Sequence, residues 1–137
     1  MITKTFEEIL LNSAFRGDDS GLPETYYLGL CSNLNVSREM TMAQINEISG
    51  DGYQRLAAPK TAIGWNEVEE QSDCLSIRSQ QVTFNPTGNW TAFNRMFLCD
   101  AASGSECNLL AVSTPLPNEV SLEADQTYPV AFEFYLK

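Results

Sequence analysis

The first rhythm of hydrophobic and polar positions along this chain is helical and covers about residues 5–16. The apolar residues that recur at helical spacing there are Phe6, Ile9, Leu10 and Ala14. They follow the start of a capping-box pattern, Thr5-Phe6-Glu7-Glu8, and are followed by Gly17. A capping box satisfies the first free N–H groups of a helix, and glycine often ends one. The pattern therefore predicts a short amphipathic N-terminal helix.

Most of the remaining chain has short apolar runs between turn residues, or the two-residue period of a strand. Strands are expected at residues 25–31, 53–57, 90–99, 108–113 and 128–136. In the last of them one face carries Val130, Phe132, Phe134 and Leu136, while Ala131, Glu133 and Tyr135 share the other. Burial of one face only is typical of antiparallel sheets, and Pro129 is placed at the start of this strand.

Three segments are read less simply. Residues 74–79 and 81–84 form either one long strand or two broken ones. A second capping box at Thr41-Met42-Ala43-Gln44 predicts a short helix that runs to Ile48. Residues 59–73 are expected to be irregular and acidic. Strands 90–99 and 108–113 should pair across the turn at residues 100–104.

Six or more short strands with only brief helices favour two sheets packed face to face over alternating α/β units. The fold class expected is all-β, a jelly-roll-like antiparallel β-sandwich with a short N-terminal helix. At 137 residues the chain has the usual size of one domain, so residues 1–137 are expected to form a single β-sandwich domain.

The net charge of the chain excludes some classes of binding partner. There are 18 acidic and 8 basic residues, for a formal net charge of −10. Such a surface repels phosphate backbones and anionic lipid, so neither nucleic acid nor a membrane is an expected partner. The chain has no histidine, which excludes Ser-His-Asp and Cys-His centres and histidine-containing zinc sites.

The four cysteines, Cys31, Cys74, Cys99 and Cys107, include no Cys-x-x-Cys pair, so they predict neither a zinc ribbon nor a thioredoxin-like motif. The first residues lack the apolar run of a signal peptide. We therefore expect synthesis in a reducing cytoplasm and free thiols.

No motif predicts an enzyme, a cofactor or a metal site. The acidic stretch Gly17-Asp18-Asp19-Ser20-Gly21 lacks the spacing of a calcium loop and is read as a solvated linker. Glu67, Glu69 and Glu70 are read as a charged loop face rather than a general acid/base pair.

One binding alternative concerns the aromatic residues Tyr26, Tyr27, Tyr53, Trp65, Trp90 and Tyr135, which would stack on sugar rings if they formed one platform. Aromatic residues in a small sandwich are mostly core, so this carbohydrate-binding module is the least favoured reading.

Several motifs resemble those of small tailed-phage virion proteins, the tail fibre or minor tail proteins, over nearly the whole chain. Leu10-Leu11 and Phe15-Arg16-Gly17 end the helix, and Tyr27-Leu28-Gly29-Leu30 is similar to a Tyr-Val-Gly-Leu strand. Ile48-Ser49-Gly50-Asp51-Gly52-Tyr53-Gln54-Arg55 is similar to a Ser-Gly-Gly-Gly-Tyr-x-Arg segment, and Val82-Thr83-Phe84 to a recurrent strand end. Gly88-Asn89-Trp90-Thr91 is similar to a Gly-Asp-Trp-Gly turn. The most specific match is Phe97-Leu98-Cys99-Asp100-Ala101-Ala102-Ser103-Gly104 with Asn108-Leu109-Leu110. The chain departs from the pattern at residues 31–47 and at Ser105-Glu106-Cys107.

The resemblance implies a non-enzymatic structural protein of a tailed-phage virion, made in the bacterial host cytoplasm. It implies a tail or tail-fibre-associated component on the particle exterior; a capsid decoration (cement) protein bound outside the head is the alternative. The partners implied are other phage structural proteins, with a homo-oligomer expected in the assembly. Because a sandwich already buries its inner faces, Phe6, Ile9, Leu10 and Ala14 are the candidate assembly contacts; the other reading is that they serve the domain's own core.

Overall fold

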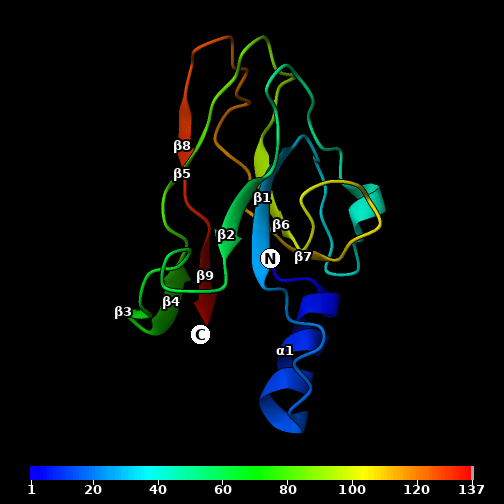
Figure 1. The fold of residues 1–137 in the computed structure, drawn as a ribbon, viewed down its shortest axis with the longest axis vertical. Coiled ribbons are helices and arrows are strands. Elements are labelled where there is room, and N and C mark those ends of the chain that lie inside the picture. The colour runs from blue at the N-terminus through cyan, green and yellow to red at the C-terminus, as the bar shows by residue number, and fades with distance from the viewer. Residues whose placement is uncertain (137) are drawn as a thin grey trace.

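A computed structural model describes residues 1–136, which form one helix and nine strands in three antiparallel sheets (Figure 1). The helix is α1 (Lys4–Arg16), and a single turn of 3-10 helix spans Met42–Gln44. The strands are β1 (Thr25–Cys31), β2 (Leu56–Pro59), β3 (Glu69–Gln71), β4 (Cys74–Arg78), β5 (Val82–Phe84), β6 (Arg95–Cys99), β7 (Leu109–Val112), β8 (Tyr128–Val130) and β9 (Glu133–Leu136). The prediction of an all-β, sandwich-like fold with a short N-terminal helix is confirmed. No helix among residues 1–136 has the length and apolar character needed to cross a membrane.

The main sheet has the order β2-β1-β6-β7. The predicted pairing of β6 with β7 is confirmed, with a bulge between Leu98 and Cys99. The first three residues lengthen this sheet, because Met1 and Val112 exchange main-chain hydrogen bonds and the N–H of Thr3 bonds to the carbonyl of Leu110. Residues 1–3 therefore lie along the outer edge of β7, and α1 starts from that edge.

One face of the main sheet packs on the smaller sheets β3-β4-β9 and β5-β8. The core between them contains Leu28 and Leu98 from the main sheet and Phe132 from the segment between β8 and β9. On the other face, Phe97 and Cys99 are covered by Met40 and Met42 from the long connection after β1. Main-sheet side chains of both faces are therefore buried, which explains why β1 has apolar residues on both sides.

The C-terminal strand predicted at residues 128–136 is divided into β8 and β9, and the partner segment is divided into β4 and β5. Ile77 pairs with Phe134 and Val82 with Val130, so five steps along one segment correspond to four along the other. One extra residue is accommodated before β5, where the hydroxyl of Ser79 accepts the N–H of Phe132. This is the geometry of a β-bulge, which bends a strand pair from one sheet into the next. The reading of two broken strands at residues 74–84 is therefore the right one.

The prediction that Val130, Phe132, Phe134 and Leu136 share one buried face is confirmed for the first three and wrong for Leu136. Phe132 is buried, and Val130 and Phe134 pack on the core as predicted. Leu136 is exposed, because β9 extends past the end of the main sheet. Pro129 is at the centre of β8, opposite Thr83, and not at the start of a long strand.

Four other boundaries differ from the prediction. The second helix is only the turn at Met42–Gln44, because Ile48 and Asn46 make main-chain hydrogen bonds to the end of β1 and so must be extended. The strand predicted at 53–57 is displaced to Leu56–Pro59, because the N–H of Tyr53 closes a turn on Gly50. The strand predicted at 90–99 is regular only over Arg95–Cys99; its first half makes isolated bridges to residues 50 and 120. The region expected to be irregular contains β3, which forms a hairpin with β4.

Candidate assembly surface

Helix α1 projects from one end of the sheets (Figure 1), and its start is fixed by Thr3. The fully buried Thr3 hydroxyl accepts the N–H of Phe6 at 3.3 Å and donates to the carbonyl of Leu109 at 2.6 Å. The sequence placed the cap at Thr5, which is in fact inside the first turn. The correct cap depends on β7, because only there does the Thr3 hydroxyl find its acceptor. At the other end, Gly17 adopts φ +67° and ends the helix as predicted.

Two of the four predicted assembly contacts pack against the chain's own core. Phe6 is 6% exposed, with its ring centroid 6.3 Å from that of Tyr26 and 6.1 Å from that of Phe134. Ile9 is half-buried and lies close to Gly21, where an added Cβ would be 2.9 Å from its Cγ1. The first two turns of α1 therefore close one end of the sandwich.

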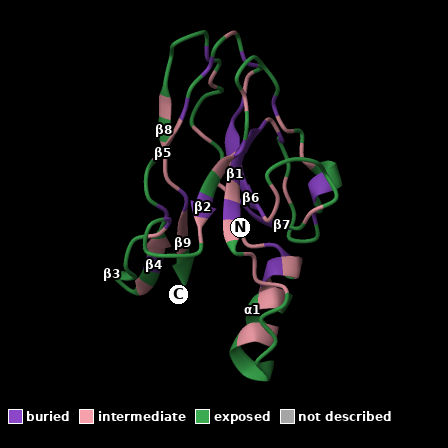
Figure 2. Ribbon diagram, in the orientation of Figure 1, coloured by how far each residue is buried: buried purple, intermediate pink, exposed green. Residues whose placement is uncertain are grey.

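The other two predicted contacts face solvent, as the exposed far end of α1 in Figure 2 shows. Leu10 is 38% exposed and Ala14 is also exposed. Beside them are Leu11 and Phe15, at 59% and 83% exposure. Residues 10 and 14, like 11 and 15, are four apart and so neighbours on the helix surface. We call Leu10, Leu11, Ala14 and Phe15 the apolar tip.

Leu11 and Phe15 are not among the predicted contacts, although both belong to the motifs on which the family resemblance depends. Helical periodicity selects a single apolar face, and only Phe6 and Ile9 of that face reach the core. Leu11 and Phe15 lie outside that face. The signal that would have identified them is the presence of a leucine and a phenylalanine on the predicted polar face.

A buried arginine fixes the connections on the other face of the main sheet. The side chain of Arg55 is 3% exposed and forms a bidentate pair with Glu47, with N–O distances of 2.9 and 2.7 Å. Arg55 also donates to the carbonyls of Ala101 and Gly104, at 2.9 and 2.8 Å. The Glu47 carboxylate raises the pKa of Arg55 above its ordinary value, so its positive charge is permanent. One guanidinium thus joins two loops that are far apart in sequence.

Tyr53 and Trp90 connect the same region to a third part of the core, around Leu30, Phe84 and Phe93. The Tyr53 hydroxyl donates to Glu47 at 2.8 Å and accepts the N–H of Leu30 at 3.0 Å. The Trp90 indole donates to the carbonyl of Asp51, and Gly50 lies so close that a Cβ there would be 2.3 Å from the Trp90 ring. The glycines, Tyr53 and Arg55 of the Gly-rich motif are therefore explained by packing and hydrogen bonding.

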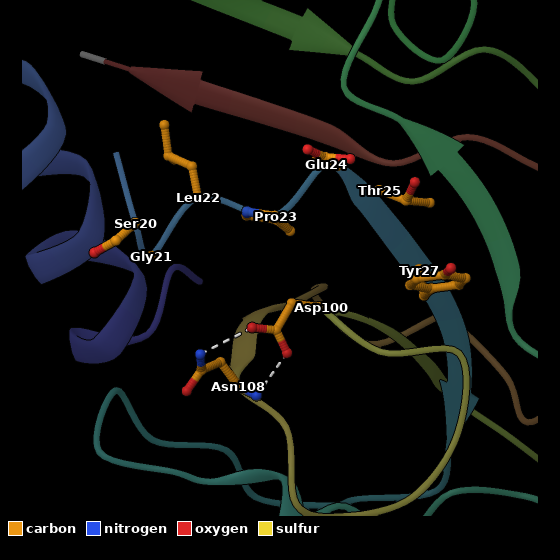
Figure 3. A pocket seen from close by; sticks show the side chains of 9 residues that line it. All are labelled: Ser20, Gly21, Leu22, Pro23, Glu24, Thr25, Tyr27, Asp100 and Asn108. Atoms are coloured by element: carbon orange, nitrogen blue, oxygen red, sulfur yellow. Dashed lines mark hydrogen bonds between the residues drawn. The ribbon is translucent and has the colours of Figure 1, made fainter. Parts of the chain in front are cut away.

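The pocket in Figure 3 is formed by the segment before β1 and by the start and end of the 100–108 loop. Its volume is about 360 Å³. Within it, the two carboxylate oxygens of Asp100 accept hydrogen bonds from the main-chain and side-chain nitrogens of Asn108, each at 2.8 Å. Asp100 thereby closes the loop. Glu24 and the hydroxyl residues Ser20 and Thr25 also line the pocket, but within residues 1–136 no hydrogen bond joins them to Asp100.

Other candidate sites have structural partners. In the acidic linker, the Asp18 carboxylate accepts the N–H and hydroxyl of Ser20, and Asp19 accepts from Ser13. Glu69 and Glu70 lie on the exposed strand β3. Residues 1–136 contain no group of three side chains placed to bind a metal ion.

The aromatic residues are divided among separate parts of the core. Tyr26 and Trp65 pack edge to face in the core around Leu28 and Phe132, and Tyr53 and Trp90 do so in the core around Phe84 and Phe93. Tyr27 packs on the other face of the main sheet, against the residues around Phe97, while Tyr135 is exposed on β9. The six residues do not form one flat platform, so the geometry for stacking sugar rings is missing.

Comparison with known proteins identifies the family. Residues 1–132 match the protein family described as podophage GP4 fiber I protein gp80. The chain belongs to this phage fibre family. No curated protein matches the chain. The resemblance to a tail fibre family is thus confirmed, and the match covers α1, the main sheet and the second layer up to β8 but ends before β9.

Membership of the phage fibre family makes this chain a structural component of the virion, where it interacts with other virion proteins. The motifs that carry the resemblance are those whose contacts were described above. They position the loops and close the core.

Proposed function

We propose that this chain is a non-enzymatic component of the phage tail or tail fibre that attaches to another virion protein through the apolar tip of α1. The observation that carries the proposal is the exposure of Leu11 and Phe15 beside Leu10 and Ala14 on a projecting helix. Single exposed apolar side chains are ordinary, but a contiguous group on one element marks an interaction surface. The family supports the placement in a fibre.

The role proposed is mechanical. Residues 1–3 pair with β7 and Phe6 lies in the core, so a load applied at the tip of α1 is transmitted to the main sheet through main-chain hydrogen bonds and packed side chains. The whole chain acts as one β-sandwich domain in this proposal. A helix that projects from a rigid β-sandwich is suited to binding a neighbouring virion protein.

The test is a double substitution that keeps the helix but removes its apolar end. Glutamine has nearly the helix propensity of leucine, so Leu11→Gln with Phe15→Gln should leave the thermal melt of the purified protein unchanged. Phage particles assembled with this variant should contain at least tenfold less of it than of the wild type, measured by quantitative mass spectrometry against the major capsid protein.

Ile63→Gln is the matched control, since Ile63 is 81% exposed on a loop far from α1 in the sequence. It should be incorporated like the wild type. Normal incorporation of the α1 double variant would contradict the proposal. The position in the particle is tested separately: a label fused to this chain should appear on the tail in electron micrographs, whereas a label over the whole head would identify a capsid decoration protein.

A further inference from the structure

A second surface of the molecule is an apolar groove between two sheet edges. It has a volume of about 550 Å³. Met96 and Phe132 line it from the two layers, residues 1–2 form one side, and residues 133–135 of β9 form the other. The groove is thus the open side of the sandwich, where the main sheet ends at its N-terminal edge and the second layer ends at β9.

The strand β9 presents unused main-chain groups on this side. It is the last strand in the order β3-β4-β9, so only one of its edges is paired among residues 1–136. In an antiparallel pair, alternate residues exchange hydrogen bonds with the partner strand. The N–H of Ser79 bonds to the carbonyl of Phe132, which shows which alternate residues of the C-terminal run face β4. Counting in steps of two from Phe132, Phe134 and Leu136 bond to β4. Glu133 and Tyr135 therefore direct their N–H and C=O groups away from β4.

The β3–β4 hairpin leads independently to the same assignment of hydrogen-bonded residues between β4 and β9. Its two-residue turn makes Gln71 and Cys74 a hydrogen-bonded pair, so Cys74 and Ser76 bond to β3. Leu75 and Ile77 are left to bond to β9, where their partners are Leu136 and Phe134. The outward direction of Glu133 and Tyr135 thus follows from two separate sets of contacts.

The opposite side of the groove has the same property. Met1 and Thr3 use their main-chain groups on β7, so the N–H of Ile2 between them points away from that strand. The groove therefore has an apolar floor and an unpaired main-chain edge on each side. These are the features that bind an extended segment by strand addition, in which main-chain hydrogen bonds supply affinity and alternate side chains enter the floor.

We propose that this groove binds an extended segment of another virion protein, which adds to β9 as a fourth strand of the β3-β4-β9 sheet. The segment has apolar side chains at alternate positions, facing Met96 and Phe132, and a lysine or arginine close to Glu133. The proposal depends on the proposed function only in requiring a virion partner, and it uses a surface other than the apolar tip.

Charge decides the occupant. The charged groups that line the groove are the carboxylates of Glu7 and Glu133 and the N-terminal ammonium of Met1. Glu7 is already paired with Arg38, and the ammonium donates to the carbonyl of Val112. Glu133 accepts one hydrogen bond from the neutral amide of Gln71. A second copy of this chain would bring another net charge of −10 to the same place, so a basic segment of a different protein is favoured.

Hydrogen exchange of the chain within intact particles tests the proposal directly. In the purified protein, the amides of Glu133 and Tyr135 should exchange quickly, while those of Phe134 and Leu136 are protected by β4. In particles, both outward amides should become protected, as measured by mass spectrometry of C-terminal fragments. Unchanged exchange at Glu133 and Tyr135 would overturn the proposal, since side-chain contacts alone would not protect these amides.

A proline at the edge provides the second test. Tyr135→Pro removes an N–H that β4 does not use, and proline is tolerated at such an edge position, so the purified variant should still melt cooperatively. Its content in particles should fall at least tenfold, whereas Tyr135→Ala, which keeps the N–H and removes only the side chain, should fall much less. Equal incorporation of both variants would contradict strand addition.

The two proposals fail differently. If the wild-type chain is absent from particles, the proposed function itself is wrong. If the chain is present, depends on Leu11 and Phe15, and shows no protection at Tyr135, only the strand addition is wrong. Addition of a second copy of this chain would be recognised as protection of the same amides in a concentrated solution of the purified protein, and would overturn the choice of partner.

Discussion

A Cβ atom on Gly29 would lie 2.2 Å from Cζ of Phe97, so the Phe97 ring occupies the place of a side chain at Gly29. The two residues are opposite each other on β1 and β6. The same ring also lies beneath Arg55, whose guanidinium carbon is 5.5 Å from the ring centroid. Absence of a side chain at position 29 therefore positions the ring that supports the buried ion pair.

Gly29→Ala should therefore destabilise the protein by about 1–3 kcal/mol, the usual cost of an extra methyl group in a packed core. Urea denaturation measures it. The double variant Gly29→Ala/Phe97→Leu should lose less stability than the two single losses added together, because leucine vacates part of the contested space. Strict additivity would mean that Phe97 is not what excludes a side chain at position 29.

Arg55→Ala should cost about 3–5 kcal/mol of unfolding free energy, because it removes the cation that pairs with Glu47 and leaves the carbonyls of Ala101 and Gly104 without their donor. Chemical denaturation of the variant provides the value. The matched control is Arg38→Ala, which breaks the exposed pair with Glu7 and should change stability little. Similar effects of the two substitutions would show that burial of Arg55 does not matter.

The C-terminal run gives a graded prediction. Phe132→Ala should cost about 3–5 kcal/mol because the side chain is 4% exposed in the core. Phe134→Ala should cost less, since Phe134 is half-buried against Phe6 and Trp65. Glu133→Gln should be nearly neutral, because its hydrogen bond with Gln71 is exposed to solvent. Thermal melts of the three variants would rank them, and any other order would contradict the register of β9.

Stability should fall in alkaline solution. Burial raises the pKa of Cys31 to about 11 and that of Cys99 to about 12, from an ordinary value near 9. Above pH 9 the unfolded chain releases these thiol protons while the folded chain keeps them, so the unfolded state is favoured. Each thiol should lower the unfolding free energy by about 1.4 kcal/mol per pH unit between pH 9 and its folded pKa.

Denaturant titrations at pH 8 and pH 10 measure this effect. The variant Cys31→Ala should lose less stability between the two pH values than the wild type does.

All four cysteines are free thiols in the structure. A thiol assay of the unfolded, non-reduced protein should therefore find four, and the same assay at pH 8 on the folded protein should miss Cys31 and Cys99, which are fully buried. Rapid labelling of Cys31 in the folded protein would contradict the packing described.

Local sequence signals determined the elements that are stabilised by their own residues. Helix α1 was predicted to its last residue because Gly17 supplies the left-handed C-cap. Strand β1 was predicted with both ends correct, since apolar residues on both faces and flanking turns define it. The pairing of β6 with β7 followed from one short turn. The all-β fold and the resemblance to phage fibre proteins needed only these signals and the family motifs.

Tertiary structure alone decided the details that depend on partners distant in the chain. The cap of α1 is Thr3 because the hydroxyl reaches Leu109, more than a hundred residues away. The C-terminal run is divided because its partner segment has one extra residue before β5, which no pattern within residues 128–136 contains. Periodicity predicts which face of a helix is apolar, but only the packed sheets determine where that helix leaves the core. Of the four residues that the sequence selected, Phe6 and Ile9 therefore pack on the core, while Leu10 and Ala14 do not. The structure added Leu11 and Phe15 to the exposed apolar residues.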